Sequence, residues 1–419
     1  MVKWILGDLF LKDFGHQDSI RILWETRWKF PCKLGVYPFH DGKLEDFEPI
    51  FNKLIEGKTC TADPDARSTA LIPGIFRLGN VNDPYDDAFA SAFFPTAEAL
   101  AKEAQSLESS DRARAIELYR RSACVYRLSR FPYIGTPLKR KAYEEQKKVY
   151  MRGARLWDVP LTEEIIPFTD AVEGDGKEIP LYVRMPKDAS KEKPVPVMLL
   201  VTGLDGHRPD NYERTEEHLK RGWATVICDI PGVADCPALK TDPKSSDRLF
   251  TTILNWIKSQ PQLNEKKVIA WGLSAGGYHA IRLAHTHASQ LAGAVGHGAG
   301  THHYIGAEWL KEVNHHEYPF DLRRAYLGKY GYSSWEELVE KCQKDFSLVD
   351  NGIVNQMSCR LLLINGMLDG CTPVEDSMLL MEYGSPKEAR FIQGRAHMGY
   401  PEANSVVFPW LEEVMGTAS

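Results

Sequence analysis

Residues 266–287, which read KKVIAWGLSAGGYHAIRLAHTH, decide the fold class of this chain. Val268–Trp271 is a short apolar run of the kind found in a buried strand, and the residues after Gly277 have the apolar spacing of a helix. Between the two lies GLSAG (272–276), a GxSxG motif at a strand-to-helix turn. Such a motif also arises by chance as a tight glycine turn with an incidental serine. The strand before it and the helix after it favour a nucleophilic Ser274.

The sequence on both sides of this segment repeats the alternation of strand and helix. Strands are predicted in PVPVMLLVTG (194–203), WATVICDIPG (223–232), LAGAVGHGAG (291–300) and RLLLINGMLDG (360–370), and helices in NYERTEEHLKRG (211–222), SDRLFTTILNWIKSQ (246–260) and VVFPWLEEVM (406–415). Before them, the turn-rich GDG at 174–176 joins two alternating runs and predicts a hairpin. The fold class predicted is α/β, a mostly parallel sheet covered by helices on both faces.

Two further regions complete the predicted organisation. Residues 1–158 form a helical N-terminal region, because segments 41–58, 96–129 and 138–157 have apolar residues at helical spacing. Residues 159–419 form the α/β domain. Within it, the aromatic-rich insertion 302–356 would lie over the carboxyl ends of the strands as a lid, where such sheets bind ligands.

A nucleophilic serine needs a base, and the base needs an acid to orient it. In this architecture the expected chain order is Ser, then Asp or Glu, then His. Asp369 follows the strand RLLLING, and His397 follows the short strand of ARFIQGRAHMGYP, so both occupy the expected strand ends. Asp350 and Glu375 are weaker candidates for the acid. The predicted catalytic residues are Ser274, Asp369 and His397.

Acyl transfer also needs backbone donors for an oxyanion. One is the N–H of Ala275, which follows the nucleophile; the other comes from the loop after the strand VMLLV, where Leu204 is assigned and Gly203 is nearly equivalent. Asp205 in the same loop either faces substrate or caps the turn. In the lid, aromatic side chains could stack on a flat substrate or form the lid's own core. These lid candidates are Tyr304, Trp309 and Tyr318.

The composition of the chain argues against several other classes of protein. The 419 residues carry a net charge of −6, which gives no reason to expect nucleic-acid binding. The eight cysteines form no CxxC pair and are expected to be reduced, and no apolar run is long enough to insert in a membrane. The histidine pairs 302–303 and 315–316 lack HExxH spacing, so neither a metal nor another cofactor is expected. These observations together predict a cytoplasmic protein.

The serine elbow, the acid and the histidine together resemble an α/β-hydrolase over residues 160–419. Three other stretches, RWKFPCKLGVYPFHDG (27–42), VTGLDGHRPDN (201–211) and QGRAHMGYP (393–401), resemble the fungal yellowish-green-type heptaketide hydrolases of dihydroxynaphthalene-melanin biosynthesis. The bacterial 2,6-dihydroxypseudooxynicotine hydrolase is a more distant resemblance. It also breaks a carbon–carbon bond and also has an N-terminal helical region.

This resemblance implies a cofactor-free serine hydrolase that cleaves a carbon–carbon bond next to a ketone. Its substrate would be an aromatic polyketide, a naphthopyrone heptaketide shortened to 1,3,6,8-tetrahydroxynaphthalene with release of acetoacetate. The N-terminal region would cap the site, form a homodimer, or do both, and peripheral association with endosomes or vesicles is an alternative to a purely cytoplasmic location. The residues do not separate this reaction from that of a carboxylesterase or other acyl hydrolase with the same triad. A non-catalytic binding protein is the third reading.

Overall fold

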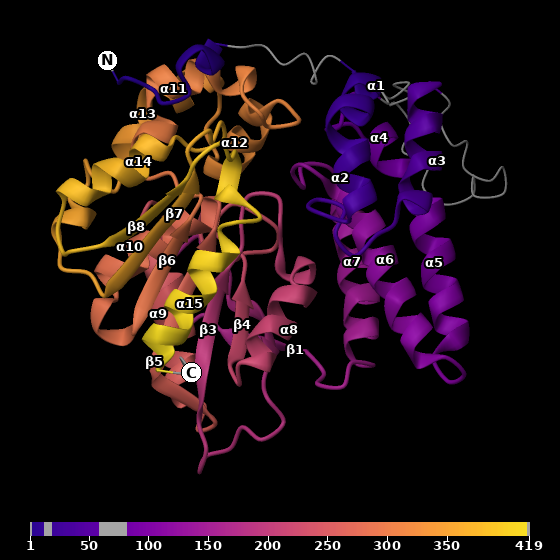
Figure 1. The fold of residues 1–419 in the computed structure, drawn as a ribbon, viewed down its shortest axis with the longest axis horizontal. Helices are drawn as coiled ribbons and strands as arrows, with labels where there is room; N and C mark the ends of the chain where they lie inside the picture. Colours follow the sequence, from indigo (N-terminus) through magenta and orange to yellow (C-terminus); the bar gives the residue numbers. More distant parts are fainter. Residues whose placement is uncertain (1, 12–18, 58–81, 417–419) are drawn as a thin grey trace. The chain divides into compact units, whose positions relative to one another are not determined.

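The computed structural model describes residues 2–11, 19–57 and 82–416, and it divides into two compact units. Gly15–Asp158 form a helical unit, and Val159 to the carboxyl terminus form an α/β unit that also includes the first residues of the chain (Figure 1). No helix among the described residues has both the length and the apolar character needed to cross a membrane. The predicted α/β class with a helical N-terminal region is thereby confirmed.

The helical unit contains the helices that the apolar spacing predicts, with sharper bounds. Its helices are α1 (Ile20–Leu23), α2 (Lys29–Leu34), α3 (Leu44–Ile55), α4 (Asp87–Ser91), α5 (Phe94–Leu107), α6 (Arg112–Arg130) and α7 (Pro137–Ala154). The predicted helix at 96–129 is two helices, because Asp111 ends the connection between them and caps α6 by accepting the N–H of Arg114.

Aromatic side chains fill the core of the helical unit. The rings of Trp24 and Phe51 are stacked with centroids 4.2 Å apart, and Trp28 meets Phe51 edge to face at 5.8 Å. Beside them, the buried Arg121 on α6 donates from Nε to Asp46 Oδ2 at 3.0 Å and from Nη2 to Oδ1 at 2.5 Å. This paired charge ties α6 to α3, since a buried guanidinium without its carboxylate would be costly.

In the α/β unit, eight described strands form one sheet in the order β1-β2-β4-β3-β5-β6-β7-β8. The strands are β1 (Thr162–Pro167), β2 (Glu178–Arg184), β3 (Val195–Val201), β4 (Ala224–Cys228), β5 (Leu263–Leu273), β6 (Gly293–His297), β7 (Arg360–Gly366) and β8 (Glu388–Ile392). The first two form the predicted antiparallel hairpin, β2 pairs antiparallel with β4, and the remaining pairs are parallel. The central strands are buried on both faces, as their continuous apolar runs require.

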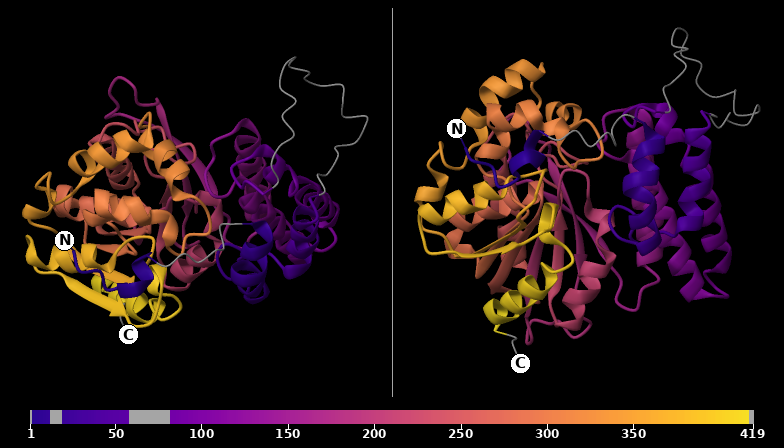
Figure 2. Two further views of the ribbon diagram at one scale, coloured as in Figure 1. Left: turned by 90° about the horizontal axis from the view of Figure 1, so that it is seen from above. Right: turned by 45° about the horizontal axis from the view of Figure 1, so that its top comes forward.

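Helices cover both faces of this sheet (Figure 1). With the strand order of the sheet, right-handed crossovers place α9 (Ser245–Ser259), α10 (Ala275–Thr286) and α14 (Val374–Leu379) on one face and α8 (Tyr212–Lys220) on the other. The final helix α15 (Asn404–Met415) lies beside α8, since Arg221 at the end of α8 donates to Glu412 at 2.6 Å. The predicted insertion between β6 and β7 contains α11 (Ala307–Glu312), α12 (Leu322–Tyr330) and α13 (Trp335–Phe346). Figures 1 and 2 show these three helices gathered at one end of the sheet, the end at which the chain continues from β6 into the insertion.

The first residues of the chain depart from the predicted division at residue 158. Residues 2–11, with the short helix η1 (Gly7–Leu11), pack within the α/β unit against the lid. The Trp4 ring lies 5.1 Å from that of Trp309, and the Phe10 carbonyl is hydrogen-bonded to Nε2 of His316 at 3.0 Å. Residues 2–10 carry several large apolar side chains, and packing against the insertion removes part of their surface from water.

Two glycines bring the start of α10 against the ends of β3 and β5. A Cβ on Gly272 would lie 2.1 Å from the carbonyl oxygen of Gly276, and one on Gly276 would lie 2.2 Å from that of Thr202. Both obstacles are backbone atoms, which cannot move without shifting a strand or the helix. The GxSxG glycines are therefore required by packing.

We expect Gly272→Ala to destabilise the protein by about 3 kcal/mol, because the new methyl group overpacks a backbone contact. Urea unfolding of the full chain, followed by circular dichroism, measures this change. Gly135→Ala is the matched control, because its Cβ would meet nothing closer than the Tyr133 ring at 3.4 Å. Equal stability of the two variants would contradict the packing argument.

Candidate active site

Ser274 lies at the sharp turn between β5 and α10. Its backbone has φ 55° and ψ −121°, a conformation that L residues rarely adopt. The turn is held by two hydrogen bonds, from Ser274 N–H to the His297 carbonyl at 2.8 Å and from Gly277 N–H to the Ser274 carbonyl at 2.7 Å. This geometry projects the hydroxyl away from the sheet edge at the N-terminus of α10.

The structure brings Ser274, His397 and Asp369 into one hydrogen-bonded chain. Ser274 Oγ lies 2.8 Å from Nε2 of His397, and Nδ1 of His397 lies 2.7 Å from Oδ2 of Asp369. A carboxylate can only accept, so Nδ1 carries the proton and Nε2 of the neutral ring accepts from the serine hydroxyl. The side chain of His397 is 21 % exposed, whereas that of Asp369 is fully buried.

The Asp369 carboxylate is held by the loop that carries it. Oδ1 accepts the N–H groups of Cys371 at 2.7 Å and Thr372 at 2.8 Å, and Oδ2 accepts the Thr372 hydroxyl at 2.8 Å. Asp369 thus faces His397 in a fixed orientation. The weaker candidates for the acid are engaged elsewhere, since Asp350 lies 3.8 Å from His302 and Glu375 accepts the Ile5 N–H.

The surroundings of His397 favour its charged form. Burial opposes the charge, but the neighbouring Asp369, with its hydrogen bond, and the carboxylates of Glu317 and Asp205 outweigh burial and raise the pKa of His397 to about 8. The ring therefore gains a proton easily when a neighbouring group releases one.

Both predicted oxyanion donors have their N–H groups available among the described residues. Neither Leu204 nor Ala275 donates a backbone hydrogen bond there, whereas the N–H of Gly203 donates to the Gly206 carbonyl at 3.2 Å. This difference favours Leu204 over the alternative Gly203. A role of Leu204 and Ala275 in binding an oxyanion stays a prediction.

The three aromatic residues predicted to line the site from the lid have different surroundings in the structure. The Tyr318 hydroxyl donates to Asp205 Oδ2 at 2.8 Å, so this lid residue reaches the loop after β3. Tyr304 is buried, with its hydroxyl 2.8 Å from that of Tyr330. Trp309 is 0 % exposed beneath Trp4, which gives it a packing role. Contact of any of these residues with substrate stays a prediction.

Glu317 of the lid is a site residue that the sequence analysis does not identify. Its Oε1 accepts the backbone N–H of His397 at 2.9 Å and that of Gly370 at 3.1 Å, so one carboxylate joins the loops of the base and the acid. Burial, and then the charge of Asp369, raise the pKa of Glu317 to about 7. No spacing rule singles out a glutamate in NHHEYP, because its partners lie 53 and 80 residues away.

Comparison with known proteins identifies a family. The model of the family described as "Esterase FrsA-like" matches residues 93–416, well over half of the chain. The chain belongs to the FrsA-like esterase family. Among curated members, it is 21 % identical to Esterase FrsA of Photobacterium profundum over 322 residues, covering 75 % of this chain and 73 % of that protein. It is 23 % identical to Esterase FrsA of Citrobacter koseri over 292 residues, covering 69 % and 67 % respectively.

Solved structures show that this FrsA-like esterase has a known α/β fold. A crystal structure of 2,6-dihydroxy-pseudo-oxynicotine hydrolase has a TM-score of 0.64 at 17 % identity, covering 78 % of this chain and 88 % of that one. The structure of AbyA5 has a TM-score of 0.61 at 16 % identity, covering 78 % and 84 %. At these identities the similarity establishes the α/β-hydrolase fold, and the substrates of those proteins do not transfer with it.

One group of described residues in this FrsA-like esterase has the composition of a metal site. The ligand atoms of Asp369, Cys371 and His397 lie within 4.8 Å of one another. Coordination there would have to replace the hydrogen bond between His397 and Asp369. It would also need the Cys371 thiolate, although burial raises the pKa of that thiol well above its usual value. The arrangement therefore suits proton transfer better than metal binding.

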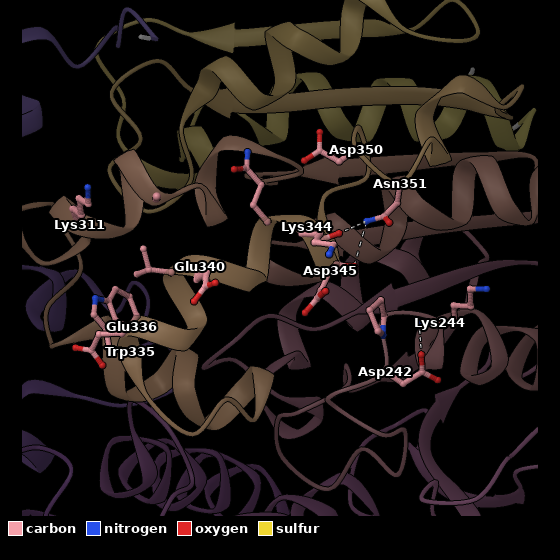
Figure 3. A pocket seen from close by; sticks show the side chains of 14 residues that line it. Asp242, Lys244, Lys311, Trp335, Glu336, Glu340, Lys344, Asp345, Asp350 and Asn351 are labelled. Atoms are coloured by element: carbon pink, nitrogen blue, oxygen red, sulfur yellow. Dashed lines mark hydrogen bonds between the residues drawn. The ribbon is translucent and has the colours of Figure 1, made fainter.

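A surface depression of about 1120 Å³ lies away from these residues. It is lined by α13, α11 and the segment before α9, including Trp335, Lys344 and Asp242 (Figure 3). Ser274, Asp369 and His397 do not line it. Its lining mixes acidic and basic side chains, and it brings together no nucleophile, base and acid like those of the Ser274 site.

We expect Glu317→Ala to lower the free energy of unfolding by about 2 kcal/mol, because two backbone N–H groups lose their acceptor. Glu317→Gln keeps an acceptor oxygen and should cost much less. Thermal unfolding of the two variants measures the difference. If alanine and glutamine are equally disruptive, the carboxylate does not act by joining the two loops.

Proposed function

We propose that this FrsA-like esterase is a serine-dependent acyl hydrolase whose substrates are esters. The observation that supports the proposal best is the hydrogen-bonded chain from Ser274 Oγ through His397 to the buried Asp369. It lies at the N-terminus of α10, beside two backbone N–H groups without acceptors among the described residues. This is the combination of nucleophile, base, orienting acid and oxyanion donors that acyl transfer requires.

The proposed reaction begins when neutral His397 takes the proton of Ser274 through Nε2. Ser274 Oγ attacks the acyl carbon, and the N–H groups of Leu204 and Ala275 hold the oxyanion. The charged imidazole then protonates the leaving alkoxide, and the ester bond breaks to give an acyl-serine. Water, deprotonated by His397, releases the acid and restores the serine. Asp369 keeps Nδ1 protonated throughout, so Nε2 is the atom that moves the proton.

A second candidate is the carbon–carbon hydrolysis implied by the sequence resemblance. It would use the same acyl-serine but requires a proton to be delivered to a carbanion leaving group. The observation that favours it is Glu317, a second group with a pKa near neutrality beside the His397 loop. The substrate would then be a naphthopyrone heptaketide, cleaved to 1,3,6,8-tetrahydroxynaphthalene and acetoacetate.

We expect Ser274→Ala to lower kcat/KM for 4-nitrophenyl esters by about 10⁴-fold or more, because it removes the nucleophile. Release of 4-nitrophenolate measures the rate. A fluorophosphonate should transfer its phosphonyl group to Ser274 of the wild type, with loss of fluoride, and leave the variant unmodified, as seen by mass spectrometry of the intact protein.

Near-normal turnover by Ser274→Ala would contradict the proposed nucleophile. A parallel incubation of the wild type with the heptaketide naphthopyrone distinguishes the two candidates. Formation of 1,3,6,8-tetrahydroxynaphthalene faster than ester hydrolysis would favour carbon–carbon cleavage. If the naphthopyrone is unchanged while the fluorophosphonate labels Ser274, ester hydrolysis is the candidate function that the experiment supports.

We expect kcat/KM to rise with pH and to reach half its maximum near pH 8, because His397 must be neutral to accept the serine proton and its pKa is raised to about 8. Asp205→Asn removes one of the charges that stabilise the imidazolium, so the midpoint should move to lower pH. Rate profiles between pH 5 and pH 10 measure both. Asp350→Asn is the control, because Asp350 pairs with His302 rather than with the triad. A midpoint unchanged by Asp205→Asn would contradict the electrostatic account.

A further inference from the structure

Lys329 is a buried cation in the lid helix α12. The residue is 6 % exposed, and its ammonium donates to the Pro231 carbonyl at 3.4 Å and lies 4.3 Å from the centroid of the Tyr330 ring. Among the described residues, no carboxylate lies within ion-pair distance of it. A buried charge is normally paired with an opposite charge, because burial removes its hydration.

The other groups around Lys329 do not supply the missing negative charge. The acidic groups whose charge would raise the pKa of Lys329 are the thiols of Cys342 and Cys236. Burial raises the pKa of both thiols, so they stay neutral. Burial also lowers the pKa of Lys329 to about 8, which leaves the ammonium largely protonated at neutral pH.

His279 on α10 is a second buried group with unmet hydrogen-bonding capacity. It is 4 % exposed, and neither ring nitrogen has a hydrogen-bond partner among the described residues. Its neighbours are aromatic, with the Tyr278 ring 5.0 Å and the Phe250 ring 6.2 Å away. Buried polar atoms of this kind are normally satisfied by ordered water or by a ligand.

A chain of aromatic contacts connects the two groups. The hydroxyl of Tyr330, which follows Lys329, lies 2.8 Å from that of Tyr304, and the Tyr304 ring lies 6.4 Å from the ring of Tyr278, which precedes His279. Burial, and then the charges of Lys329 and Arg282, lower the pKa of His279 well below its usual value. The imidazole is therefore neutral and offers one N–H donor. A cation and a neutral donor, both without an acidic partner, together match an anionic oxygen.

The position of this pair relates it to Ser274. His279 follows Ala275 by four residues on α10, so the two share a face of the helix about 6 Å apart along its axis. On α12, Tyr326 precedes Lys329 by one turn, and its pKa is raised by burial and then by nearby groups that include Cys371 and Asp369. A small acyl substrate attached at Ser274 would need to extend by about one helical turn to reach His279.

We propose that Lys329 and His279 recognise an anionic oxygen of the substrate, a carboxylate, phenolate or enolate set apart from the scissile bond. This inference rests on the proposed acyl-hydrolase function and names its substrate class. The surroundings of the base are acidic instead, since the carboxyl groups of Asp369, Glu317 and Asp205 act on His397. The two charge distributions orient a substrate in one direction, with its acidic group in the lid and its acyl carbon at Ser274.

The test compares matched esters that differ in one charge. Mono(4-nitrophenyl) glutarate and 4-nitrophenyl butyrate differ by a carboxylate on the acyl side. 4-Acetoxybenzoate and its methyl ester differ by a carboxylate on the leaving-group side. We expect kcat/KM of the wild type to favour one anionic ester over its neutral partner by about 10- to 100-fold. Competitive inhibition by benzoate or by pentafluorophenolate, with benzamide as the neutral control, distinguishes a carboxylate from a phenolate site.

Lys329→Met should abolish this preference by slowing the anionic ester, with the neutral ester changed less than about threefold. Lys344→Met is the matched control, since it removes an exposed lysine from the same lid and should keep the preference. His279→Leu should weaken the preference as well, which provides a second variant if Lys329→Met does not fold. Benzoate binding to Ser274→Ala, measured by calorimetry, should be lost when Lys329→Met is added.

Equal kcat/KM for anionic and neutral esters in the wild type, on both the acyl and the leaving-group side, would overturn the proposal. So would an equal loss for both kinds of ester in Lys329→Met. These outcomes differ from failure of the proposed function, in which no ester would be hydrolysed and the fluorophosphonate would not label Ser274.

Discussion

The strained backbone of Ser274 is the constraint on which the site depends. A φ of 55° at a non-glycine residue costs free energy and persists only where the surroundings leave no alternative. Here the alternatives are removed by the contacts of Gly272 and Gly276, which press the start of α10 against the ends of β5 and β3. The stability of the sheet therefore offsets the cost of this strained backbone. As a result, the Ser274 hydroxyl has a fixed position relative to His397.

The charges around His397 have opposing consequences. Asp369, Glu317 and Asp205 stabilise the imidazolium, which aids proton transfer from serine during attack. The same charges raise the pKa of the base, so a smaller fraction of the enzyme is active at neutral pH. They also repel an anionic group that approaches the triad. An acidic substrate would need a compensating cation further from the reacting atoms, and this is the role proposed for Lys329.

Sequence patterns predicted what depends on local spacing and chain order. The GxSxG turn, the parallel strands and the strand ends that carry Asp369 and His397 follow from periodicity and from the order of elements in the sheet. Glu317 was not predictable in this way, because its role comes from two backbone N–H groups that only tertiary packing brings to it. The docking of Trp4 on the lid was missed for the same reason, since helical spacing gives no information about which surface a terminal segment covers.

The sheet and the insertion between β6 and β7 have different roles in the α/β unit, and this difference explains why the reaction is easier to assign than the substrate. The sheet and its strand ends place the reacting groups, and the fold is shared with a hydrolase that is only 17 % identical. The insertion between β6 and β7 supplies Tyr318 to the loop after β3 and the buried Lys329, whose ammonium donates to the Pro231 carbonyl after β4. Because backbone similarity at such identity does not preserve individual side chains, the substrate has to be inferred from the insertion's own residues. Their most informative member is a buried ammonium without a carboxylate partner among the described residues, and this favours an acidic ester over a neutral one.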